Sequence, residues 1–193
     1  MNCKYNAVAA IAAFSLVASL AHADGLLGKR YIEVGVGTDS DAEDFGFDLG
    51  YHMPIKADKI DLGIVVGRDE DGVVETALVD FTFYGPTAAG SKTQMFIAPI
   101  VGYFQVDTGN WWSGNVSDFV YGVSVGTEYE LDEKSNITTS LSYLDSEDYG
   151  DFGVTLNVGY DYWFTESFNG EATIGYNTES EDVSFSVSAR WAF

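Results

Sequence analysis

Cysteine, basic residues and long apolar runs are all scarce in this chain of 193 residues. The one cysteine, Cys3, lies near the amino terminus, so it is neither half of a disulfide nor at the position of a lipid-attachment cysteine. Nine lysines and arginines stand against 30 aspartates and glutamates, which gives a formal net charge of −21. No nucleic-acid partner is expected, because binding phosphates requires clustered Lys and Arg. Without disulfides, the domain must be held together by burial or by closed strand pairing.

The long apolar run that does occur is at the front of the chain. Lys4 precedes it, residues 7–21 form it, and Ala21, His22 and Ala23 give it the small-x-small pattern of a cleavage site. The run is shorter than the ~20 residues that a membrane-spanning helix needs. We therefore predict a secretory signal peptide over residues 1–23. Residues 24–193 would then form one exported domain, which no Pro- or Ser-rich linker divides.

The rest of the chain alternates apolar and polar residues, most clearly at its carboxyl end. Over residues 183–193 every second side chain is apolar, while serines and Arg190 occupy the positions between. A period of two indicates a β-strand with one apolar and one polar face. We expect strands of roughly nine to twelve residues, the length of a tilted membrane-spanning strand. The alternating segments are 29–37, 44–53, 60–66, 77–83, 93–106, 119–129, 137–143, 152–162, 168–176 and 183–193.

The segment 93–106 is the least clear of these, because it is apolar on both faces and contains Pro99. The phase that fits best puts Phe96, Ala98, Ile100, Phe104 and Val106 on the same bulky apolar face as the other strands use.

Side-chain size indicates which face looks outward. One face is bulky, with Phe, Tyr, Leu, Ile and Val, whereas the other carries mainly Gly, Ser, Thr, Asn and single charges. A closed barrel has a limited interior and unlimited room outside, so the small polar groups belong inside. The alternative is an exported soluble β-domain that buries the bulky face between two sheets. Its strands would then turn their glycines to water, where glycine weakens pairing without benefit.

The final strand, which ends on Phe193 and carries Phe185 and Trp191 at alternate positions, resembles that of small bacterial outer-membrane β-barrel proteins, including porin-like barrels. The resemblance implies a location in the outer membrane, contact with its lipid and lipopolysaccharide, and recognition of this strand by the barrel-assembly machinery. We therefore predict an all-β fold, a single antiparallel up-and-down transmembrane β-barrel of about ten strands. Eight strands is the alternative, if residues 92–106 or a short hairpin are miscounted.

Charge segregates between the connections of such a barrel. With both chain ends in the periplasm, as the resemblance implies, the connections 38–44, 68–72, 107–115, 145–151 and 177–182 face outward, and most are acidic. The inner turns hold Lys56, Lys59, Lys92 and Lys134. The acidic outer loops are expected to form a solvated, mutually repelling surface. The alternative is weak binding of divalent cations, which could bridge the loops to lipopolysaccharide phosphates. The loops lack the glycine and the bidentate glutamate of an EF-hand, so neither a specific metal site nor a cofactor is expected.

Charged residues also occur on the predicted inward face. The carboxylates with this phase are Glu33, Asp48, Asp61, Asp80, Glu128, Asp161 and Glu171, and the cation assigned to the same face is Arg190. Because the first strand must close against the last, Glu33 and Arg190 could approach each other across the seam. Two interpretations are open. The network is either a structural polar plug centred on Arg190 or the lining of a narrow, water-filled, cation-preferring path.

The sequence offers few candidate catalytic residues. His52 is the one histidine of the predicted mature chain, and we expect it in the lumen near the periplasmic end of its strand. Outer-membrane deacylases, palmitoyl transferases and omptin proteases have their sites at the outer rim, so this position does not suit their chemistry. Trp111 and Trp112, on the longest outer loop, form either a surface contact point or part of an aromatic belt. We therefore expect a non-enzymatic barrel with a structural or surface-interaction role. A narrow cation-preferring channel is the alternative, and an outer-membrane enzyme is the less favoured one.

Overall fold

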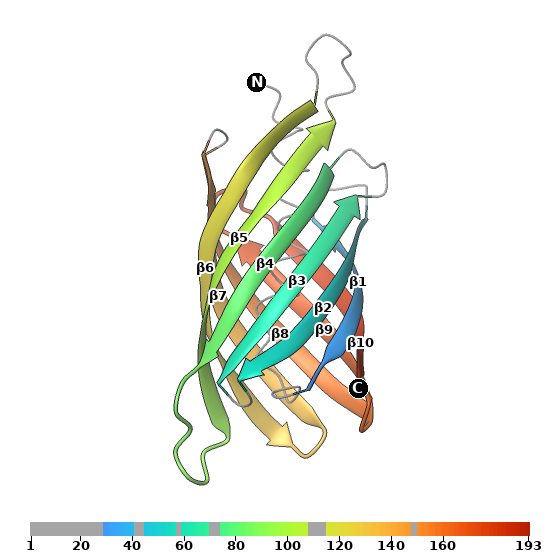
Figure 1. Cartoon of the computed structure of the whole chain (residues 1–193), viewed down its shortest axis with the longest axis vertical. Helices are drawn as coiled ribbons and strands as arrows, with labels where there is room; N and C mark the ends of the chain where they lie inside the picture. The colour runs from blue at the N-terminus through green and yellow to red at the C-terminus, as the bar shows by residue number, and fades with distance from the viewer. Residues whose placement is uncertain (1–28, 41–44, 57–58, 70–73, 108–114, 148–149) are drawn as a thin grey trace.

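Ten antiparallel strands form the whole of the regular structure in the described part of this computed structural model (Figure 1). The structure describes residues 29–40, 45–56, 59–69, 74–107, 115–147 and 150–193. The strands are β1 (Tyr31–Asp39), β2 (Gly46–Lys56), β3 (Ile60–Asp69), β4 (Val74–Tyr84), β5 (Thr93–Asp107), β6 (Asn115–Asp132), β7 (Ser135–Ser146), β8 (Gly150–Thr165), β9 (Phe168–Asn177) and β10 (Val183–Ala192). Within these ranges, no helix is long and apolar enough to cross a membrane.

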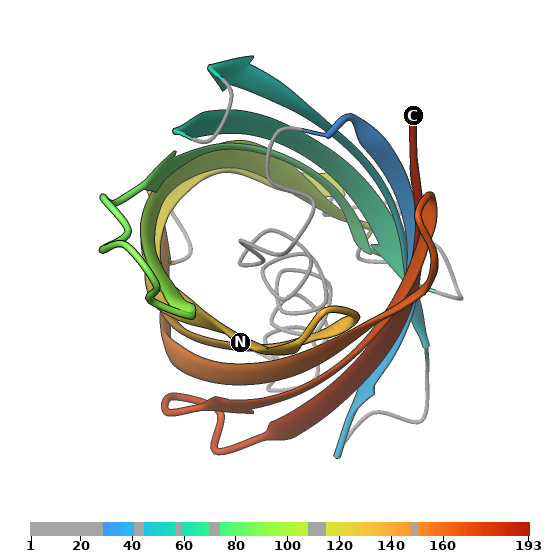
Figure 2. The same ribbon diagram turned by 90° about the horizontal axis from the view of Figure 1, so that it is seen from below.

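Each strand pairs with its neighbours in the sequence, and β1 pairs with β10 to close the barrel (Figure 2). The closing register places Glu33 opposite Arg190 and Tyr31 opposite Ala192. Closure gives every strand two partners, so no edge is left with unpaired backbone groups. The predicted single antiparallel up-and-down β-barrel is confirmed, with ten strands and not eight.

Bulky apolar side chains point away from the barrel axis. Phe47 is 53% exposed and Leu156 is 46% exposed, and both belong to a ring of outward-facing Phe, Tyr, Leu, Ile and Val side chains. The positions between them are buried, as the alternating burial along β2 and β7 shows. The bulky face is therefore the outer surface of the barrel and not the core of a sandwich.

Strand β5 has the opposite phase to the one predicted from its sequence. Phe96, Ile100 and Phe104 are buried and face inward, whereas Met95 and Tyr103 are exposed on the outside. The neighbouring ladders set this phase, because Ile100 pairs with the inward-facing Asp80 on one side. Both faces of β5 are apolar, so its own side chains could not distinguish the two phases.

Candidate functional site in the barrel lumen

The inward-facing charges gather around Arg190 on β10. Its side chain is fully buried and donates hydrogen bonds to three carboxylates from three other strands. Nε lies 2.7 Å from Glu33 Oε2 on β1, Nη1 lies 2.8 Å from Asp161 Oδ1 on β8, and Nη2 contacts Glu171 Oε2 on β9. The ladders explain this grouping, since Glu33 is opposite Arg190 and Asp161 is opposite Glu171.

Three carboxylates around one guanidinium leave an excess of negative charge. Burying a charge is costly unless it is paired, so the excess must be compensated by water, protons or mobile cations. A cavity lined in part by Glu33, Asp48 and Glu171 adjoins the cluster, and its volume of about 10 Å³ has room for about one water. This side of the lumen is therefore a polar wall that needs small polar partners.

The other predicted lumen carboxylates lie apart from the Arg190 cluster. Asp80 is buried and accepts a hydrogen bond of 2.7 Å from Thr82, and the half-buried Asp61 accepts one of 3.1 Å from the Tyr84 hydroxyl. Asp48 is buried on β2, and Glu128 is buried on β6, where it lines the cavity at one mouth of the barrel. The predicted set is thus one tight cluster with separate carboxylates around it.

Two aromatic side chains, Tyr31 and His52, lie beside the cluster, and Tyr31 was not singled out in the sequence as part of a site. Tyr31 stacks on the imidazole of His52, with ring centroids 4.4 Å apart and planes 8° apart. The guanidinium of Arg190 lies 5.8 Å from the centre of the Tyr31 ring, within the range of a cation–π contact. His52 is therefore a packed lumenal side chain. The inward phase of Tyr31 was visible in the sequence, but its partners became visible only once β1 was placed between β2 and β10.

Several buried polar atoms have no hydrogen-bond partner among the described residues. They include Asp80 Oδ1, Asn157 Oδ1, and both the amide oxygen and nitrogen of Asn169. Buried polar groups are normally satisfied, and water does this where protein groups do not. These side chains face the lumen from three different strands, so they indicate a hydrated interior.

The opposite wall of the lumen is apolar. We call it the apolar strip, and it consists of Val65, Leu78, Ile100, Phe104, Val120 and Leu144, all buried and inward-facing on β3 to β7. Leu78 lies over Gly102 and Leu144 over Gly122, where any Cβ would collide with the leucine side chain. The glycines therefore let large side chains lie along the wall and not project toward the axis. The expectation that the inward face is mainly small and polar holds for β9, β10 and most of β7, but not for this strip, which includes Leu144 on β7.

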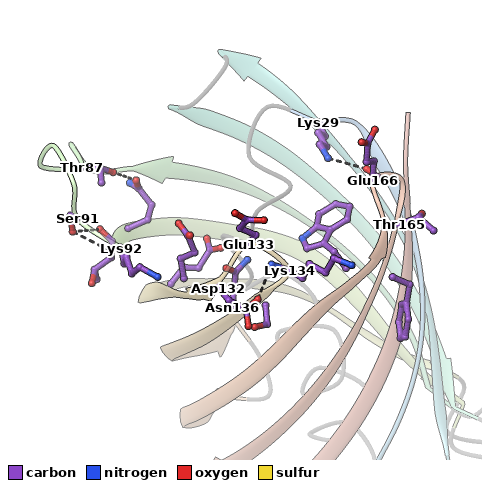
Figure 3. A pocket seen from close by; sticks show the side chains of 17 residues that line it. Lys29, Thr87, Ser91, Lys92, Asp132, Glu133, Lys134, Asn136, Thr165 and Glu166 are labelled. Atoms are coloured by element: carbon purple, nitrogen blue, oxygen red, sulfur yellow. Dashed lines mark hydrogen bonds between the residues drawn. The ribbon is translucent and has the colours of Figure 1, made fainter.

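A cavity of about 890 Å³ lies at the mouth near Phe193, which we call the C-terminal mouth (Figure 3). Lys29, Lys92 and Lys134 line it together with Glu128 and other acidic residues. Two of the ammonium groups are held by backbone carbonyls at 3.1 Å, Lys29 by that of Glu166 and Lys92 by that of Leu131. The lining carries both signs of charge, with three ammonium groups and five carboxylates.

Trp111 and Trp112 lie outside the described residues, as do large parts of the acidic outer connections. The described residues contain no group of three or more His, Cys, Asp or Glu side chains placed to hold a metal ion.

Comparison with solved structures places this geometry among outer-membrane proteins. No family model and no curated protein matches the sequence. The outer-membrane channel of the COG4313 group from Pseudomonas putida F1 superposes with a TM-score of 0.58 at 9% identity, covering 86% of this chain and 96% of that chain. The KdgM porin superposes with a TM-score of 0.53 at 12% identity, covering 84% of this chain and 99% of that chain, alone and in complex with disordered oligogalacturonate. The chain therefore has the closed β-barrel fold of outer-membrane porins and channels.

Proposed function

We propose that this protein is a narrow, water-filled channel of the outer membrane that prefers cations. The observation that carries the proposal is the imbalance of buried charge. Within the described residues, Arg190 is the one buried Lys or Arg side chain. The buried carboxylates are Glu33, Asp48, Asp69, Asp80, Asp118, Glu128, Asp161 and Glu171.

An interior of this charge favours cations for a simple electrostatic reason. Uncompensated carboxylates raise the local concentration of cations and repel anions, and the low-dielectric wall strengthens both effects. A dry interior could hold these eight carboxyl groups only if most of them were protonated, because Arg190 pairs with three of them. The lumenal polar atoms without protein partners support the same conclusion, because they need water.

The number of strands is consistent with a water-filled path along the barrel axis. Eight strands enclose an interior that side chains alone can fill, and the diameter grows with the number of strands. Ten strands therefore enclose a wider interior than eight do. The similar fold of porins and channels supports the same class of function. The lumen charge opposes an acidic solute such as the oligogalacturonate in one KdgM structure, so we propose a different solute class for this chain.

The surrounding proposals follow from the fold and the sequence together. We infer that the chain is exported by its signal peptide, is non-enzymatic, and sits in the outer membrane in contact with lipid and lipopolysaccharide. A structural or surface-contact role is the second candidate, favoured by the excess of acidic residues in the outer connections. The lumenal charges favour the channel, because neither surface contact nor simple anchoring requires carboxylates inside the barrel.

Planar-bilayer recording tests the channel directly. The chain from residue 24 onward, refolded in lipid, should show discrete conductance steps and a reversal potential of cationic sign in a KCl gradient. The double substitution Asp48→Asn and Asp80→Asn should lower this selectivity, since both carboxylates face the lumen. Glu75→Gln is the matched control, because it removes the same charge from an exposed side chain. A folded barrel without steps, or one with anion selectivity, would rule the channel out.

A further inference from the structure

The Arg190 cluster and the apolar strip border each other at β2. Along one row of the ladder Glu33 is opposite Gly50, and Gly50 is opposite Val65, the first residue of the apolar strip. A Cβ built on Gly50 would lie 3.3 Å from Glu33 Cβ and 3.4 Å from Val65 Cγ2. A single glycine therefore separates the Arg190 cluster from the apolar strip.

Carboxylates also border the strip at other points. Asp80 is opposite Ile100 in the next row, and Asp118 is opposite Phe104. Asp80 Oδ1 is buried and has no hydrogen-bond partner among the described residues. Neighbouring strands are about 5 Å apart, so an anionic oxygen and an alkyl wall lie within reach of one small molecule.

We propose that the lumen binds amphipathic cations, with an ammonium group near Asp80 and an alkyl or aryl body along the apolar strip. The proposal rests on the channel function proposed above and names the class of cation that fits it. A bare metal ion would leave the strip in contact with water. An anionic amphiphile would place its head beside carboxylates, and a neutral apolar molecule would offer no donor to Asp80 Oδ1, which has no hydrogen-bond partner among the described residues.

The shape of the strip suits a slender chain. Val65, Leu78 and Val120 fall in one row across β3 to β6, with Gly102 between the last two. The row therefore spans three strand spacings, about 14 Å. Because Leu78 lies over Gly102, its side chain lies along the wall beside Val65 and Val120.

A series of alkyltrimethylammonium ions tests the proposal as blockers of the potassium current. Butyl, hexyl and octyl members should block at progressively lower concentration, with about a threefold to fourfold gain for each added methylene. Tetramethylammonium should block weakly, and octyl sulfate should not block, because it has the tail but the opposite charge. Equal block by octyl sulfate, or block independent of tail length, would overturn the binding proposal and leave the channel proposal intact.

Substitutions by side chains of nearly equal size test which residues form the proposed binding site. The double substitution Val65→Thr and Val120→Thr keeps side-chain shape and strand propensity but adds hydroxyls to the strip, so it should flatten the dependence on tail length. Asp80→Asn should weaken block by all members of the series. The matched control is Thr138→Val, an isosteric change at a buried lumenal side chain whose hydroxyl has no partner among the described residues. Thr138→Val should change the blocking concentration by no more than about twofold. If it flattens the dependence on tail length as much as the Val65→Thr and Val120→Thr variant does, the assignment to the strip is wrong.

A second readout separates this proposal from the channel proposal. Octyltrimethylammonium should raise the thermal unfolding midpoint of the folded barrel in lipid, relative to octyl sulfate, because a ligand that binds the native state stabilises it. The Val65→Thr and Val120→Thr variant should lose that shift. A barrel that carries no current but shows the shift in unfolding midpoint would contradict the channel proposal and support the binding site. A conducting barrel without the shift or the tail-length dependence would do the reverse.

Discussion

Arg190 is the residue on which the lumenal charges depend. Its guanidinium is planar and offers five N–H donors, which lets one side chain reach carboxylates on β1, β8 and β9 at once. All three acids are buried with it. Removing the cation would leave three carboxylates facing each other, so the side chain stabilises the barrel mainly by preventing that repulsion.

We expect Arg190→Ala to lower the free energy of unfolding by about 3–5 kcal/mol, the usual cost of removing one partner from a buried ion pair. Arg190→Lys should lose less, since it keeps the charge but not the fork of donors. Urea titration of the lipid-refolded barrel, followed by tryptophan fluorescence, measures both.

Arg68→Ala serves as the control for that experiment. Arg68 Nε lies 3.9 Å from Glu75 Oε1, and both side chains are more than half exposed. An exposed pair is worth less than about 1 kcal/mol, so this change should be nearly silent. Equal losses for the Arg68 and Arg190 variants would show that the Arg190 cluster is not a buried ion-pair network.

At the scale of a strand, β5 shows how neighbours decide a side chain's direction. Val101 is 42% exposed and Ile100 is 1% exposed, although both are apolar and adjacent. The ladder places Ile100 beside Asp80 and Gly122, which are both on the lumenal face. A charge introduced at the two positions should therefore meet two different surroundings.

Val101→Lys should destabilise the barrel by about 2–4 kcal/mol, the cost of a cation on the lipid face near the middle of the membrane. Ile100→Lys should cost less, because its ammonium group would face the lumen beside Asp80. Denaturant unfolding in lipid vesicles gives the ranking of the two. The opposite ranking would mean that β5 has the phase predicted from the sequence.

A second prediction for an element concerns the glycines beneath the apolar strip. A Cβ at Gly122 would collide with the Tyr143 carbonyl oxygen and with Leu144. Gly122→Val should therefore force β6 and β7 apart and cost about 1–3 kcal/mol, as overpacking does. The fraction that migrates as the folded form on an unheated gel should fall.

Gly85→Ala is the matched control for Gly122→Val. A Cβ at Gly85 would meet only ordinary contacts, at 3.6 and 3.7 Å, so the folded fraction should not change. A tolerated valine at position 122 would show that the leucines are not held flat by the glycines.

For the molecule as a whole, closure by β1 and β10 turns ten strands into one stable unit with a hydrated interior. The seam brings residues from opposite ends of the chain together, as the pairing of Glu33 with Arg190 shows. Neither half of the chain can complete the Arg190 cluster without the other. Closure of the whole barrel therefore precedes any lumenal function.

We expect the mature protein to begin at Asp24 and to be recovered in the outer-membrane fraction. Amino-terminal sequencing and the intact mass test the cleavage, and Ala23→Leu should block it, because the cleavage pattern needs small residues. Recovery of the uncleaved chain in the membrane, or of a soluble mature chain in the periplasm, would contradict the export route that we propose.

The order of amino acids was sufficient for the strands and the direction of most side chains, but it left the number of strands between ten and eight. A period of two puts alternate residues on opposite faces, and only one of those faces was bulky enough to belong outside. The inward phase of Glu33, Asp161, Glu171 and Arg190 could be read in this local way. Local reading failed at β5, where both faces are apolar and neither phase is preferred.

The contacts between side chains on strands that are distant in the sequence could be known only from the folded barrel. Only the registers of β1, β8, β9 and β10 place three carboxylates on Arg190, and only those of β3 to β7 assemble the apolar strip beside them. The physical reason is that alternation is a property of neighbours along the chain, whereas register and closure depend on hydrogen bonds between strands and on the space that they enclose.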